Sequence, residues 1–151
     1  MYKKILVPLD GSDASQRGLR EALQLAKSLG ASVKLVHGVN EMFMTTVNYA
    51  GMYVDDFLRS LRDAGNKLLS QAQLDAEKAG VKAETALVEA LGHSAAELIL
   101  KQAREWQADL IVMGTHGRRG VRRLVLGSDA EQVLREASIP VLMVQPAREA
   151  R

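Results

Sequence analysis

The sequence contains no cysteine and few aromatic residues, and its charges nearly balance. Aromatic residues make up 4% of its 151 residues, and the formal net charge at pH 7 is +2. The absence of cysteine excludes disulfides, thiolate metal sites and cysteine nucleophiles. The low aromatic content argues against an array of base-stacking side chains. The small net charge does not by itself imply nucleic-acid binding.

Long hydrophobic runs are also missing. The longest apolar runs, such as residues 5–9 and 110–113, are far too short to span a bilayer. The basic start at residues 1–4 resembles the beginning of a signal peptide, but the apolar run after it stops at Asp10. We therefore expect a cytoplasmic protein with no membrane insertion.

What remains is the composition of an ordinary globular domain. Apolar residues make up 47% of the chain and charged residues 25%. A chain of 151 residues suits one domain, which we place at residues 1–151. A domain of this size buries roughly 68–70% of its unfolded surface, so it needs no covalent staple.

Short apolar runs alternate with helical patterns, which is typical of a parallel α/β sheet. We predict five strands, at residues 4–9, 33–39, 81–88, 109–113 and 141–144. The first and fourth runs are apolar throughout, as in central strands, whereas the third begins with apolar–polar alternation, as at an edge. Right-handed crossovers then favour a doubly wound, Rossmann-like sheet of order 3-2-1-4-5 with helices on both faces.

The helices are predicted from periodicity and capping signals. One helix follows Ser12 and ends at Gly30, and a long one spans about residues 55–78. The predicted apolar stripe of the long helix consists of Phe57, Leu61, Ala64, Leu68 and Ala72. The stretches 94–97 and 128–131 each fit a capping box that opens a further helix.

The predicted strand order places a topological switch point between the first and fourth strands. Doubly wound sheets bind ligands at such a point, outside the carboxyl ends of the strands. Residues 10–12 and 114–117 follow these two strands. Asp10 in particular is expected to contact a ligand there, although it also suits a simple turn.

The second of these segments opens a stretch with three glycines. Gly114 and Gly117 allow a tight turn and a close approach to a ligand, and Gly127 precedes Ser128 at the start of a helix. Free N–H groups at a helix start favour an anion. Together these features suit a polyphosphate, with a hydroxyl donor from Ser128. The alternative is that the glycines only permit turns and that Ser128 only caps its helix.

Positive charge lies within the same stretch. Arg118 and Arg119 are placed to pair with phosphate oxygens, whereas Arg122 and Arg123 suit a solvated surface. The pattern is neither a P-loop nor a Gly-x-Gly-x-x-Gly dinucleotide motif. The arginines leave nucleic-acid binding as a minor hypothesis only.

Three segments together are similar to the universal stress protein family. They are Gly114-x2-Gly117-x9-Gly127-Ser128, KKILVPLDGS at residues 3–12, and IPVLMV at residues 139–144. The resemblance extends from Lys3 to Val144. In that family the glycine spacing marks the branch that binds ATP.

The resemblance implies ATP, often with Mg²⁺, as the ligand. It places Asp10 near the ribose or the metal, adenine at the backbone of Gly38 or Val39, and the phosphates at the glycine stretch and Ser128. Gly38 stands where the family commonly has a branched apolar residue. The predicted nucleotide contacts are Pro8, Asp10, Gly38, Val39, Met113, Gly114, Thr115, His116, Gly117, Arg118, Arg119, Gly127, Ser128 and Asp129. We assign no catalytic residue and no metal ligand.

Several side chains have a simpler interpretation as well. Asp129 also suits the first turn of a helix, where an acid complements the dipole. The three histidines are too scattered for a metal site. We expect His37 to be structural, His93 to face solvent, and His116 to hold its loop rather than act as an acid or phosphate donor.

The function expected is that of an ATP-binding stress-response regulator, a nucleotide-dependent switch with at most slow hydrolysis. The alternatives are an adenine-nucleotide enzyme using Asp10 or His116, or a nucleotide-independent interaction protein. The Met- and Tyr-rich segment 41–53 is either a flap or partner-binding surface, or a loop folded onto the core. The last strand, residues 141–144, would leave an apolar sheet edge, which we expect a second copy to cover in an isologous homodimer.

Overall fold

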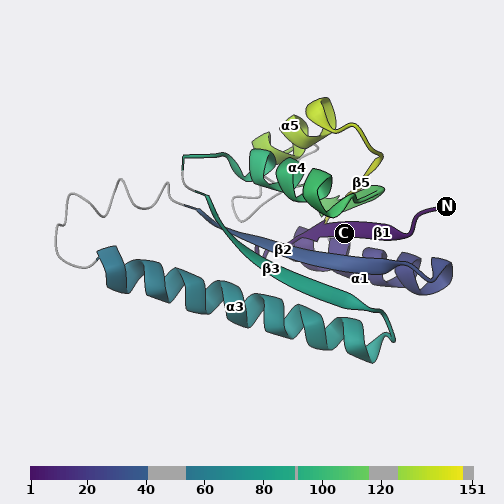
Figure 1. Cartoon of the computed structure of the whole chain (residues 1–151), viewed down its shortest axis with the longest axis horizontal. Helices are drawn as coiled ribbons and strands as arrows, with labels where there is room; N and C mark the ends of the chain where they lie inside the picture. Colours follow the sequence, from purple (N-terminus) through teal and green to yellow (C-terminus); the bar gives the residue numbers. More distant parts are fainter. Residues whose placement is uncertain (41–53, 91, 116–125, 148–151) are drawn as a thin grey trace.

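The computed structural model describes residues 1–40, 54–90, 92–115 and 126–147. Strands and helices alternate along the chain (Figure 1). In order they are β1 (Lys4–Pro8), α1 (Asp13–Leu29), β2 (Ser32–Asn40), α3 (Val54–Lys78), β3 (Ala83–Ala90), α4 (Ala95–Trp106), β4 (Leu110–Gly114), α5 (Ser128–Glu136) and β5 (Val141–Val144).

The strands form one parallel sheet of order β3-β2-β1-β4-β5. Helices α1 and α3 cover one face of the sheet, and α4 and α5 cover the other (Figure 1). The predicted doubly wound fold and its strand order are confirmed.

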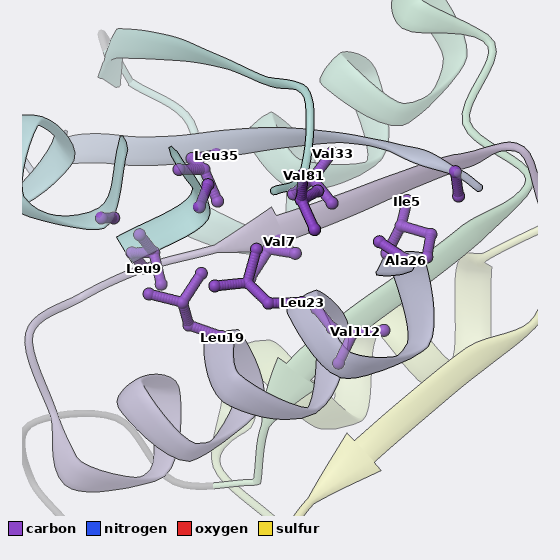
Figure 2. Packing of buried hydrophobic residues seen from close by; sticks show 14 of the residues in the cluster. Ile5, Val7, Leu9, Leu19, Leu23, Ala26, Val33, Leu35, Val81 and Val112 are labelled. Atoms are coloured by element: carbon purple, nitrogen blue, oxygen red, sulfur yellow. The ribbon is translucent and has the colours of Figure 1, made fainter. Parts of the chain in front are cut away.

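Strand β1 contributes to the core on both faces of the sheet. Ile5 and Val7 pack with α1, α3 and their neighbours, while Leu6 faces the cluster under α4 and α5. Figure 2 shows Val7 beside Leu23 and Ile5 beside Ala26, both of α1. Burial on both faces explains why this strand is apolar without alternation.

The long helix α3 differs in phase from the prediction. Ala64 is exposed, whereas Gly65 and Leu69 are buried against the sheet. The stripe predicted through Ala64 was therefore wrong at that point. The reason lies in β2 and β3, because their side chains receive Gly65 at close range, which periodicity within the helix cannot show.

One strand boundary and one helix cap also differ. Strand β3 begins at Ala83 rather than at residue 81, because the Val81 N–H donates to Ala76 O of α3. The capping box predicted at Ser94 is present, with Ser94 and Glu97 each accepting from the other's N–H. The second one, at residues 128–131, was wrong: Gly127 is the N-cap of α5, so Ser128 already lies inside the helix.

Within the described residues, none of the helices combines the length and apolarity that a membrane crossing requires.

Candidate functional site

The candidate site lies where β1 and β4 end. These strands are neighbours, and the chain leaves β1 toward α1 on one face and reaches α5 on the other face after β4. This is the predicted switch point, the place where doubly wound sheets bind ligands, and we refer to it below as the crevice.

A tight turn carries the chain from β1 into α1. Gly11 has a φ of 81°, in the left-handed region that favours glycine. Asp10 Oδ1 accepts a hydrogen bond of 2.8 Å from the Ser12 N–H, and Ser12 Oγ caps α1 by accepting from the Ser15 N–H at 3.2 Å. Asp10 is half-buried, so its carboxylate both forms the turn and borders the crevice.

Gly114, at the end of β4, is required by packing against α1. A Cβ on Gly114 would lie 2.7 Å from the carbonyl carbon of Ala14 and 2.9 Å from its oxygen. Gly114 is not among the glycines with positive φ. Because Gly117 lies outside the described residues, the tight turn remains a prediction for Gly114. Its missing side chain lets the first turn of α1 come directly against the end of β4.

The two ends of the glycine stretch meet beside this contact. The Gly127 N–H donates to Thr115 O at 2.8 Å, and the Thr115 N–H donates to Val144 O at 3.0 Å. Thr115 is only 5% exposed. Residues 114–115 and the start of α5 are thereby brought together, as the predicted site requires.

Among the described residues, no side chain caps the amino end of α5. The other two helices with described caps, α1 and α4, are closed by Ser12 and Ser94, whereas α5 begins after Gly127 with no side-chain hydrogen bond. The first N–H groups of a helix have no partner within the helix and carry the positive end of its dipole. The α5 terminus therefore offers donors to an anion.

Asp129 has a partner that the sequence did not suggest. It lies in the first turn of α5, as expected, but its Oδ1 accepts a hydrogen bond of 3.2 Å from the Ala96 N–H of α4. Ser94 Oγ donates to Gln132 Oε1 at 3.3 Å nearby. These bonds fix the start of α5 against the start of α4.

The end of β2 completes the border of the crevice. A Cβ on Gly38 would lie 3.4 Å from Leu98 Cδ1, so α4 occupies the space beside this glycine. Val39 is buried. The preceding residue, His37, places Nδ1 2.7 Å from Leu9 O, in keeping with the expected structural role. His93, as expected, faces solvent, with a side chain 63% exposed beside Glu97.

Most of the predicted contacts thus occupy one end of the sheet. The following residues lie at or beside the carboxyl ends of β1, β2 and β4 or at the start of α5: Pro8, Asp10, Gly38, Val39, Met113, Gly114, Thr115, Gly127, Ser128 and Asp129. His116, Gly117, Arg118, Arg119 and the segment 41–53 lie outside the described residues. Across the described ranges, no three His, Asp or Glu side chains gather as metal ligands would.

A separate hollow of about 100 Å³ lies at the opposite end of the sheet. Its lining includes Ala108 and Ile111 together with Gln107 and Glu136, from the carboxyl ends of α4 and α5. It shares no residue with the crevice, so we assign it no part in the candidate site.

Comparison with known proteins agrees with the fold and identifies the family. Residues 1–145 match the Universal stress protein family. The chain is 36% identical to universal stress protein MJ0531 of Methanocaldococcus jannaschii, over 96% of this chain and 83% of that protein. It is 35% identical to YxiE of Bacillus subtilis, over 96% of this chain and 100% of the relative.

Solved structures give the same answer. The structure of MJ0577 of Methanocaldococcus jannaschii superposes with a TM-score of 0.85 at 26% identity, covering 99% of both chains. A universal stress protein of Archaeoglobus fulgidus, solved in complex with dAMP, has a TM-score of 0.66 at 27% identity, covering 95% of this chain and 98% of that one. Sequence and structure together show that the chain belongs to the universal stress protein family.

Proposed function

We propose that this protein binds ATP, with Mg²⁺, in the crevice between β1 and β4 and acts as a homodimeric stress-response switch. The nucleotide state would alter the shape of the protein or its choice of a protein partner. We place this activity in the cytoplasm. Hydrolysis is expected to be slow at most, because the described residues show no positioned base with an oriented nucleophile beside it.

The observation that carries the proposal is the uncapped start of α5 beside Thr115. Phosphate groups bind well at such a terminus, where N–H donors and the dipole act together. The hydrogen bond between Gly127 and Thr115 holds this terminus beside the end of β4, which supports the proposal. Ser128, which is exposed in the first turn, adds a hydroxyl donor.

The nucleoside would lie toward β1 and β2. Asp10 follows β1 and would contact the ribose or the metal, while the backbone of Gly38 and Val39 would meet adenine. The Archaeoglobus relative in complex with dAMP supports an adenine nucleotide. So does a universal stress protein in complex with cAMP, which is 25% identical with a TM-score of 0.67.

Nucleotide retained from the expression host tests the proposal. We expect freshly purified wild-type protein to release ATP or ADP on denaturation, as identified by chromatography and mass spectrometry. Gly117→Val should release none, because a side chain there blocks close approach of the backbone to phosphate. Wild-type protein that releases nothing and gives no heat with Mg-ATP would contradict the proposal. It would favour the nucleotide-independent interaction protein instead.

Measuring ATP turnover distinguishes the proposed switch from the enzyme alternative. If Asp10 or His116 performed nucleotidyl transfer or hydrolysis, substitution of either by alanine would abolish turnover while ATP affinity remained. We expect instead that turnover in the wild type is already too slow for either substitution to lower it measurably.

The dimer is expected to form through β5. This strand pairs with β4 on one side and ends the sheet of described residues on the other, and Leu142 is 41% exposed. An apolar edge of this kind favours pairing with a second copy. Sedimentation velocity should show a dimer at micromolar concentration, and Leu142→Lys should weaken it at least about tenfold, or about 1.4 kcal/mol.

The matched control for the dimer is Leu74→Lys, which places the same charge on a leucine of α3 that is 48% exposed. It should leave the dimer intact. A wild-type monomer throughout the micromolar range would contradict the assembly.

A further inference from the structure

We propose that His37 is a positioning residue for the nucleoside. Its ring fixes the end of β1 relative to the end of β2 and holds both against α3. The inference rests on the proposed nucleotide site, because it assigns the task of aligning the two backbone segments that border the nucleoside.

The first contact is between the ring and the end of β1. His37 Nδ1 lies 2.7 Å from Leu9 O, and a carbonyl oxygen can only accept, so Nδ1 carries the proton. The Leu9 N–H donates to Val36 O at 2.8 Å. Both backbone polar groups of Leu9 are therefore held by adjacent residues of β2, one by main chain and one by side chain.

The second contact is between the ring and α3. A Cβ on Gly65 would lie 2.7 Å from His37 Cδ2 and 3.3 Å from Nε2. Only glycine at this position lets the helix approach the ring so closely. Gly65 interrupts an otherwise strong helical sequence, and this contact provides a physical reason for it.

The two residues that the ring joins lie next to the proposed nucleoside contacts. Asp10 follows Leu9 directly, and Gly38 follows His37 directly. The ring thus adds a side-chain link to the backbone pairing between the segment proposed for the ribose and the segment proposed for adenine. When a binding site already has its bound geometry before the ligand arrives, less of the binding free energy is spent on ordering the site. Loss of the ring contact would leave the bond from the Leu9 N–H to Val36 O in place but would release Leu9 O, and with it the backbone that leads into Asp10.

A positioning role differs measurably from a purely structural one. If the ring aligns the nucleoside segments, its loss weakens ATP and AMP but leaves inorganic triphosphate unaffected, since α5 holds the phosphates. If the ring merely stabilises the fold, its loss lowers the unfolding midpoint and weakens either all three ligands or none.

The experiment compares His37→Asn with His37→Gln by calorimetry. The amide nitrogen of asparagine is as many bonds from the backbone as Nδ1, so it can donate to Leu9 O, whereas that of glutamine corresponds to Nε2. We expect His37→Gln to weaken ATP and AMP about tenfold and His37→Asn to weaken them less than threefold. Inorganic triphosphate should bind both variants as it binds the wild type.

Gly65→Ala approaches the same contact from the helix. Its Cβ should displace the ring and weaken ATP about as much as His37→Gln does. In a His37→Ala background the added Cβ meets no ring, only the rotatable end of Leu87, so its further effect should be smaller. Leu69→Ala, which loosens α3 elsewhere, should lower the unfolding midpoint without changing the ratio of ATP to triphosphate affinity.

The outcomes separate this inference from the proposed function. A wild type that binds ATP, with a His37→Gln variant that binds it equally well, would overturn the positioning role and leave the nucleotide site standing. Equal losses for ATP and triphosphate would also overturn it. A wild type that binds neither ligand would overturn the proposed function and this inference with it. Independently of any ligand, ¹⁵N shifts of the imidazole should show the proton on Nδ1, and a proton on Nε2 would contradict the geometry.

Discussion

Gly114→Ala is expected to lower the free energy of unfolding by about 2–3 kcal/mol, as overpacking at a rigid contact does. The added Cβ would lie 2.7 Å from the carbonyl carbon of Ala14. This neighbour is backbone in the first turn of α1, so no side-chain rotation can relieve the contact. The helix must move away from β4, with loss of packing along both. Urea unfolding followed by circular dichroism measures the change.

Gly38→Ala is the control for this prediction. Gly38 also lies in a strand of the sheet, but its added Cβ would be 3.4 Å from Leu98 Cδ1, the rotatable end of a side chain. We expect a change of less than about 1 kcal/mol there. If the two variants were equally stable, the close approach of α1 to β4 would be contradicted.

Ser128→Asp is expected to weaken ATP binding at least about 100-fold, equivalent to about 2.7 kcal/mol. The substitution places a carboxylate where the proposed site receives phosphate. Repulsion between charges about 4 Å apart is on the order of 4 kcal/mol at an effective dielectric constant of 20. The same carboxylate complements the dipole in the first turn of α5, so the ligand-free protein should be as stable as the wild type or slightly more.

Affinity and stability are thus predicted to change in opposite directions, which a general folding defect cannot produce. Calorimetry with Mg-ATP measures the first, and thermal unfolding without nucleotide measures the second. Ser70→Asp, on the exposed side of α3, makes the same change in net charge and should leave the affinity unaltered. ATP affinity within threefold of the wild type in Ser128→Asp would place the phosphates elsewhere.

The strand order was predictable because burial leaves a direct trace in the sequence. Residues 5–7 are apolar without interruption because β1 is covered on both faces, and the alternation at residues 81–84 marks the edge of the sheet near β3. The strand order predicted the switch point, and the switch point predicted that Asp10 and Gly114 lie at one end of the sheet. Local patterns were sufficient for each of these steps.

The contacts between distant segments were not predictable in this way. Nothing near Gly114 in the sequence indicates that Ala14 fills the space beside it, and nothing near Asp129 points to the Ala96 N–H. A serine three residues before a glutamate predicted both capping boxes, but only Ser94 forms one. At the second site the hydrogen bond from Gly127 to Thr115 sets where the helix begins. Tertiary contacts decided each of these cases.

The most direct test of the central claim is to titrate ¹⁵N-labelled protein with Mg-ATP and follow the backbone amides by NMR. The account predicts saturable shifts concentrated in residues 10–12, 38–39, 114–115 and 127–130, at the carboxyl ends of the strands and the start of α5. Shifts confined to the hollow near Ala108 and Glu136, or no shifts at millimolar ATP, would contradict a nucleotide site in this crevice.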